Sequence, residues 1–116
     1  AAWEKIFDRF GANFVDWSNY PEQKKNLWQK QLHLFEVPFY YIEYAIAQLG
    51  AIAIYRNYLA DPEKTLEQYL AALKLGYTKS MKEIYETAGI RFDFSAAYIK
   101  ELMDFLKIEI EKVSAE

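Results

Sequence analysis

The sequence contains no cysteine and a single histidine among its 116 residues. Without cysteine the chain forms no disulfide and no thiolate-metal framework, which fits a reducing compartment. The one histidine, His33, stands among scattered carboxylates, and this is no ligand constellation for a metal held by this chain alone. The first residues, AAWEKIFDRF, carry charges within five positions and lack the apolar region of a signal peptide, so we expect a cytoplasmic protein.

A basic surface is also missing. The 17 acidic and 14 basic residues give a net charge of −3, and no basic stripe runs along the chain, so we exclude nucleic-acid binding. No repeat or low-complexity stretch is visible. Apolar residues make up 53% of the chain and aromatic residues 18%, which is high for a free-standing domain of this length. This excess suggests that a partner, or further chain, covers part of the apolar surface.

A long segment with little charge organises the chain. Between Val37 and Tyr55 the one formally charged residue is Glu43. We predict a single helix from Pro38 to Leu59, with the proline in the first turn, where its missing N–H has little effect. Because apolar residues run nearly all the way round this helix, we expect it to be covered on most sides and to be the central element.

The same segment is long enough for a membrane span, which needs about 20 predominantly apolar residues. Glu43 near its middle, Gln48 and the tyrosines at 40, 41 and 44 oppose that interpretation. No cluster of lysine or arginine marks a cytoplasmic side either. We therefore predict a buried helix of a soluble protein and no membrane partner.

Shorter helices are predicted around the central one, from apolar periodicity and from start and stop signals. They span residues 2–10, 21–36, 62–75, 81–88 and 95–113. Asp61 with Pro62 and Ser80 supply helix starts, and Gly76 supplies a stop. Residues 90–94 have no second strand to pair with and are expected to be an extended loop. The predicted fold is all-α, with about six helices packed around the central helix, and residues 1–116 form a single helical unit.

The candidate site residues are His33 and the tyrosines that follow it. On a continuous helix, Tyr40 and Tyr44 return to within about 20° of the direction of His33, and Tyr41 lies about 80° away on the rim of a shared groove. A bend at Pro38 would disturb this alignment. Imidazole and phenol donors suit a peptide carbonyl or a developing oxyanion, and each well-placed donor contributes about 3 kcal/mol to transition-state stabilisation.

Two interpretations of these residues compete. In the first they are core residues whose polar tips find carbonyl partners, and spacing alone favours this interpretation. In the second they form a binding or catalytic groove. The role of Glu43 is also undecided, since it is either a charge on the helix surface or a buried acceptor for a neighbouring cation.

The residues resemble a known family. The string HLFEVPFYYIEYAIAQLGA, preceded by WQKQ, resembles the C-terminal catalytic-domain signature of oligoendopeptidase F, a zinc metallopeptidase family related to thimet oligopeptidase. The similarity continues through LEQYLAALKLGYTKSMKEIYETAGIRFDF, so it covers most of the chain from about Arg9. It implies a helical peptidase that encloses a deep channel and cleaves short, unstructured peptides, with zinc held by H-E-x-x-H and a downstream glutamate.

The resemblance also implies roles for single residues. His33 would bind the substrate backbone, and Tyr40, Tyr41 or Tyr44 would donate to the tetrahedral oxyanion. The helical-face argument favours Tyr40 and Tyr44. With the resemblance counted, the catalytic interpretation of these residues overtakes the structural one.

The chain departs from the family pattern because it lacks H-E-x-x-H. The resemblance therefore implies a C-terminal fragment, inactive and zinc-free alone, whose partners are a short peptide substrate and a zinc-bearing N-terminal part. Self-association would hide the apolar surface that this part normally covers. The alternative is a stand-alone helical module for peptide binding or interaction, with no catalytic activity, which the aromatic excess and the chain length support.

Overall fold

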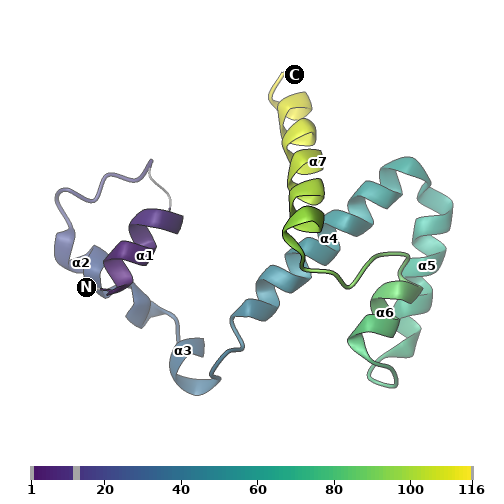
Figure 1. The fold of residues 1–116 in the computed structure, drawn as a ribbon, viewed down its shortest axis with the longest axis horizontal. Coiled ribbons are helices and arrows are strands. Elements are labelled where there is room, and N and C mark those ends of the chain that lie inside the picture. The colour runs from purple at the N-terminus through teal and green to yellow at the C-terminus, as the bar shows by residue number, and fades with distance from the viewer. Residues whose placement is uncertain (1, 12–13, 116) are drawn as a thin grey trace. The chain divides into compact units, whose positions relative to one another are not determined.

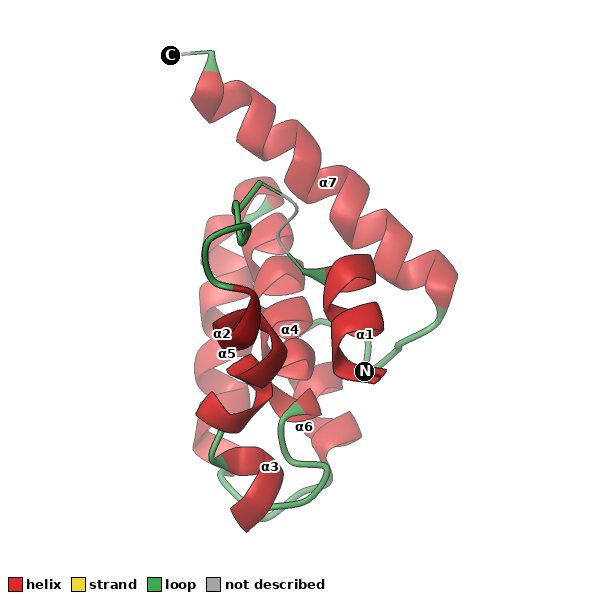
Figure 2. Ribbon diagram, turned by 90° about the vertical axis from the view of Figure 1, so that its left-hand side faces the viewer, coloured by secondary structure: helices red, strands yellow, loops and turns green. Residues whose placement is uncertain are grey.

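The computed structural model describes residues 2–11 and 14–115, and its contacts divide the chain into two compact units, Ala1–Ile42 and Glu43–Glu116. All regular structure within the described residues is helical, with seven α-helices and one short 3-10 helix (Figure 1, Figure 2). The all-α fold class is confirmed. That residues 1–116 act as a single helical unit stays a prediction.

The first unit is built from short helices. They are α1 (Ala2–Phe10), α2 (Pro21–Asn26), the 3-10 helix η1 (Leu27–Lys30) and α3 (His33–Glu36). The indole N–H of Trp3 donates to the backbone oxygen of Lys24 at 3.1 Å, and the Lys24 ammonium lies 2.5 Å from the Asp8 carboxylate. The rings of Phe7 and Trp17 meet edge to face at 6.0 Å between centroids. These contacts join α1 to α2 and to the connection between them.

The predicted helix over residues 21–36 is wrong, because the chain there forms three short helical pieces instead. Pro21 occupies the first turn of α2 as expected, but the backbone leaves the helical conformation at Gln31, with φ −90° and ψ 94°. None of the residues of α2, η1 or α3 is buried. A helix of this length depends on tertiary packing of its apolar face, and little such packing exists here.

The second unit carries the longer helices. They are α4 (Ile42–Ala60), α5 (Pro62–Leu75), α6 (Met81–Thr87) and α7 (Ala96–Ser114), and α6 lies beside α5 (Figure 1). Asp61 caps α5 by accepting from the Lys64 N–H, and Gly76 ends it with φ 53°. Ser80 and Glu83 form a reciprocal capping box on α6. These starts and stops agree with the predicted ones, and residues 90–94 form the expected extended loop.

The long apolar helix begins at Ile42, four residues later than the predicted start at Pro38. The turn that holds Pro38 prevents the helix from starting earlier. Gly50 and Ala53 are the buried residues of α4, so this unit covers the helix less than predicted. No helix among residues 2–11 and 14–115 combines the length and the apolar character that crossing a membrane requires.

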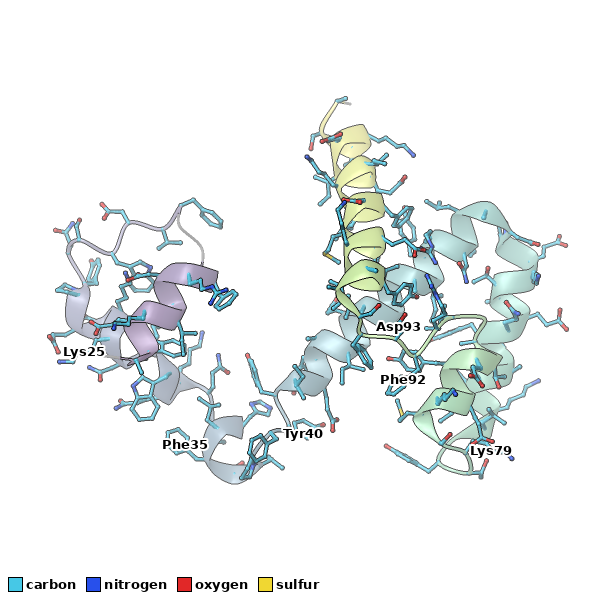
Figure 3. The ribbon with its side chains drawn as sticks, viewed as in Figure 1. Lys25, Phe35, Tyr40, Lys79, Phe92 and Asp93 are labelled. Atoms are coloured by element: carbon cyan, nitrogen blue, oxygen red, sulfur yellow. The ribbon has the colours of Figure 1, made fainter. Side chains whose placement is uncertain are left out.

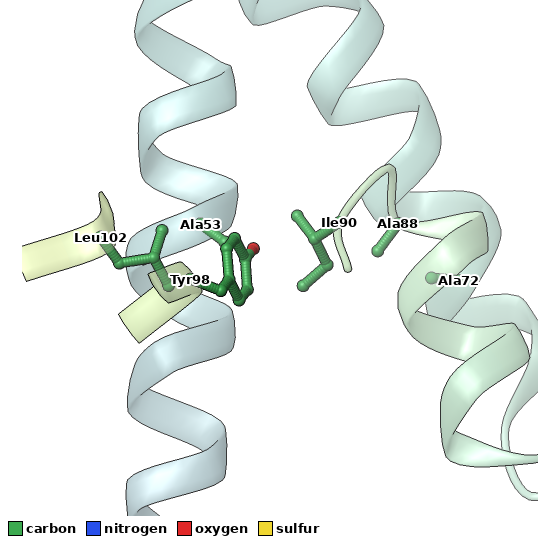
Figure 4. Close-up of a cluster of buried hydrophobic side chains, with 6 residues drawn as sticks. All are labelled: Ala53, Ala72, Ala88, Ile90, Tyr98 and Leu102. Atoms are coloured by element: carbon green, nitrogen blue, oxygen red, sulfur yellow. The ribbon is translucent and has the colours of Figure 1, made fainter. Parts of the chain in front are cut away.

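A small apolar core holds the second unit together (Figure 4). Its buried members come from α4, α5, α7 and the segment after α6, and they are Ala53, Ala72, Ala88, Ile90, Tyr98 and Leu102. Leu49, Ile52 and Ile54 of α4 pack against this cluster. Tyr85 donates its hydroxyl to the Ile46 carbonyl at 3.3 Å, which ties α6 to α4. Within this unit α4 contributes more residues to the packing than any other helix.

A charged cluster fastens α7 to its neighbours. The Glu101 carboxylate accepts from Arg56 of α4 at 2.5 Å and from Arg91 of the extended loop at 2.6 Å. The Arg91 guanidinium also lies over the Tyr98 ring, 4.0 Å from its centroid. The hydrogen bonds from Arg91, and then those from Arg56, hold the pKa of Glu101 below its ordinary value. The cluster therefore favours an ionised Glu101.

Candidate active-site segment around His33

His33 opens α3, and the chain changes direction four residues later. Val37 has φ −137° and ψ 80°, because the proline that follows disfavours the α conformation at this position. The N–H of Tyr40 donates to the Val37 carbonyl at 3.1 Å, which closes a four-residue turn. A continuous helix from His33 to Tyr44 therefore does not exist, and the angular argument that favoured Tyr40 and Tyr44 loses its geometric basis.

This turn has an unusual third residue. Pro38 occupies its second position and Phe39 its third, where φ is 66°. A proline followed by a residue with positive φ is the pattern of a type II turn, whose third position normally holds glycine or asparagine. Among the described residues Phe39 is the one non-glycine residue with positive φ. For a bulky side chain that conformation costs about 1–3 kcal/mol.

The turn brings two tyrosine rings to His33. The Tyr40 ring is stacked on the imidazole, with 6.1 Å between centroids and 5° between planes. The Tyr41 ring meets it at 5.4 Å and 60°. Tyr40 lies on the segment between α3 and α4 (Figure 3). Of the predicted site residues, the structure thus brings together His33, Tyr40 and Tyr41.

Tyr44 belongs to the other compact unit. It lies in the first turn of α4 and its side chain is half exposed. Its share in a common cleft with His33 stays a prediction. Glu43 beside it is exposed, which favours the interpretation of this residue as a charge on the helix surface.

An open groove of about 590 Å³ lies along the turn. It is lined by His33, Leu34, Val37, Pro38, Phe39, Tyr41 and Ile42. Volumes of roughly 300–1,000 Å³ are usual for ligand sites in proteins. The polar groups in this wall are the imidazole and the phenol of Tyr41, and no charged side chain lines it. The groove can therefore place two hydrogen-bonding groups beside an apolar surface.

A second groove, in the other unit, was not predicted from the sequence. It measures about 550 Å³ and lies among α4, α5 and α6, with Tyr55, Tyr58 and Tyr69 in its lining. Tyr85 also lines it, and burial, with a smaller contribution from Tyr98, raises the pKa of the Tyr85 phenol. Tyrosines repeated along neighbouring helical segments indicate such a surface in the sequence, but only the fold shows which helices face one another.

The described residues contain no group of three histidine, cysteine, aspartate or glutamate side chains that could hold a metal. A zinc site of a peptidase needs three such protein ligands and an open position. The residues around His33 do not fit a zinc ion, because its neighbours are phenols and apolar side chains. No metal chemistry is therefore assigned to this groove.

These features describe a helical protein with a hydrogen-bonding groove beside a single histidine. The model of peptidase family M3 matches residues 2–104, which is most of the chain. The chain therefore belongs to peptidase family M3, which supports a metallopeptidase as the intact protein. No curated protein and no solved structure matches it.

Proposed function

We propose that this chain is the C-terminal part of a zinc-dependent oligoendopeptidase of the oligoendopeptidase F type, which hydrolyses short peptides. In this proposal the chain supplies substrate-binding and oxyanion-stabilising residues, and another part of the polypeptide holds the zinc. Family membership supports the peptidase class. The observation that carries the residue roles is the position of the His33 imidazole, beside the rings of Tyr40 and Tyr41 and on the wall of an open groove.

The proposed roles follow from the donors that these side chains offer. The imidazole N–H of His33 would donate to a backbone carbonyl of the peptide and orient it. A phenol O–H from Tyr41, Tyr40 or Tyr44 would donate to the carbonyl oxygen that becomes negative when the scissile carbon is attacked. Neither residue loses its proton in this role. Tyr41 has the added support that it lines the groove beside His33.

The division of labour in this proposal predicts that the chain alone is inactive. Its described residues offer no ligand set for zinc, so the hydrolytic step depends on groups supplied elsewhere in the polypeptide. A zinc-binding part would also cover apolar surface that this chain exposes, such as Leu32 and Phe35. We keep a cytoplasmic location as part of the same proposal.

Two experiments test the proposal. The coding sequence upstream of Ala1 should encode an H-E-x-x-H motif in the same reading frame, and its absence there would remove the assigned class. This chain, mixed with the purified zinc-bearing part, should restore cleavage of a quenched fluorescent peptide, whereas either part alone should leave the peptide intact. Full activity of the zinc-bearing part by itself would contradict the proposed role of this chain.

The second candidate function is a stand-alone helical module that binds a peptide or another protein. The apolar groove of about 550 Å³ among α4, α5 and α6 is the observation that favours it. Size-exclusion chromatography and binding of a hydrophobic dye separate the two candidates. A sharply melting monomer that binds little dye favours the module, and a self-associated, dye-binding chain favours a part of a larger enzyme.

A further inference from the structure

The conformation of Phe39 calls for an explanation that packing does not provide. The residue adopts φ 66° at the third position of the turn, where glycine would fit without strain. The residue is nevertheless 95% exposed, so the ring gains little from contacts within its own unit. Strained residues of this kind cluster at ligand-binding and active sites.

The groove beside Phe39 has a distinct chemical character. Its wall combines the aliphatic and proline side chains of Leu34, Val37, Pro38 and Ile42 with the rings of Phe39, Tyr41 and His33. No carboxylate or ammonium group lines it, so a charged ligand group would find no partner there. An apolar side chain, in contrast, would gain from leaving water for this surface.

From these two observations we propose that Phe39 is a specificity-determining residue of the peptidase. The turn presents its ring as one wall of the groove, and this groove accepts a bulky apolar side chain of the peptide next to the scissile bond. The inference rests on the proposed function, in which His33 on the same groove wall holds the peptide backbone. The substrate class that follows is a short peptide with an aromatic or large aliphatic residue at that position.

The turn itself supplies a variant that removes the ring without disturbing the fold. In Phe39→Gly, glycine adopts positive φ freely, so the backbone of the turn is retained and its strain is relieved. Phe14→Gly is the matched control, because Phe14 is also exposed, at 91%, and does not line this groove. Both variants are made in the intact peptidase that contains this chain.

The experiment compares kcat/KM for two quenched fluorescent peptides that differ only beside the scissile bond, where one carries phenylalanine and the other alanine. Mass spectrometry of the products checks that both are cut at the same bond. The unmodified enzyme and Phe14→Gly should prefer the phenylalanine peptide by about tenfold or more, as apolar pockets commonly discriminate. Phe39→Gly should lose most of this preference through a lower kcat/KM for the phenylalanine peptide, with the alanine peptide little affected.

Two results would overturn the inference. One is an unchanged ratio between the peptides in Phe39→Gly. The other is an equal loss on both peptides, which would assign Phe39 to the assembly of the enzyme. A His33→Ala variant separates these failures from a failure of the proposed function. If His33→Ala loses activity on both peptides while the Phe39→Gly ratio is unchanged, only the inference fails, whereas wild-type activity in His33→Ala removes the proposed function itself.

Discussion

At the scale of single residues, the proposed site is the place where one imidazole meets two phenols. His33 lies on α3, and Tyr40 and Tyr41 follow the turn that Pro38 begins. Of the three, His33 and Tyr41 line the same groove. Their value for binding in the proposed site comes from this shared position, since preorganised donors lose little when a ligand arrives.

In the second unit, the backbone conformation and surroundings of Gly89 make a side chain at this position unfavourable. Gly89 has φ 74°, and a Cβ there would lie close to the Gln68 side-chain amide. Gly89→Ala should lower the free energy of unfolding by about 1–3 kcal/mol, because alanine must hold positive φ and its Cβ must displace the Gln68 amide.

Urea unfolding of Gly89→Ala, Gln68→Ala and the double variant measures the effect of the contact. The double variant should lose less stability than the sum of the two single losses, because Gln68→Ala removes the contacting amide while leaving the strain. Strictly additive losses would show that the contact with Gln68 has no energetic effect.

At the scale of helices, residues within the first and last turns determine where each helix starts and ends. In α6 the Ser80 hydroxyl accepts from the Glu83 N–H at 3.3 Å, and the Glu83 carboxylate accepts from the Ser80 N–H at 2.9 Å. The bond from the Ser80 N–H to the Glu83 carboxylate, and then the one from the Ser80 hydroxyl at 2.8 Å, lower the pKa of Glu83. Ser80→Ala removes the cap and should reduce the free energy of unfolding by about 1 kcal/mol.

The matched control is Ser114→Ala, since Ser114 closes the C-terminal end of α7 with a bond to the Ile110 carbonyl and caps no N-terminus. Thermal unfolding followed by circular dichroism compares the two. A smaller effect at Ser80 than at Ser114 would contradict the capping argument.

The attachment of α7 should depend on pH. Glu101 has a folded pKa below its unfolded value of about 4.3, because Arg91 and Arg56 donate to its carboxylate. Its contribution to stability is therefore complete above about pH 4.3 and is lost as the pH falls through the lower folded value. The free energy of unfolding should decrease over that acidic range.

Glu101→Gln keeps the shape of the side chain and removes its charge. It should lower stability at pH 7 and flatten the decrease below about pH 4.3, while Glu111→Gln, whose pair with Lys107 spans one helix turn, should leave both nearly unchanged. Urea unfolding across this pH range measures both effects. An unaltered pH profile in Glu101→Gln would contradict the assignment.

An element was predictable from the sequence where interactions between residues close together in the chain determine it. The bounds of α5 agree with the prediction because Asp61, Pro62 and Gly76 act within one or two turns. The break of residues 21–36 and the later start of α4 did not emerge from periodicity. Residues 21–36 break into short helical pieces because tertiary packing that would support one long helix is missing there. Helix α4 starts later because Phe39 adopts a backbone conformation that its residue type disfavours.

At the scale of the whole molecule, membership of peptidase family M3 assigns the class, and the groove around His33 is the site that we propose for it. That one short segment holds an imidazole and several tyrosines could be read from the sequence, but their arrangement did not follow from the helical spacing. The prediction assumed a continuous helix, whereas a turn brings Tyr40 and Tyr41 to His33 from different directions. The apolar groove of the second unit could not be predicted from the sequence alone, because its lining comes from three helices.

The central claim is that the phenol O–H of a tyrosine of this chain donates a hydrogen bond to the oxyanion of the substrate. The most direct measurement is kcat and KM of Tyr41→Phe, Tyr40→Phe and Tyr44→Phe in the intact peptidase, with Tyr77→Phe, a fully exposed tyrosine outside both grooves, as the control. At least one of the three should lower kcat by about 10²–10³-fold with little change in KM, as the loss of one oxyanion donor does. Wild-type turnover in all three variants would contradict the account.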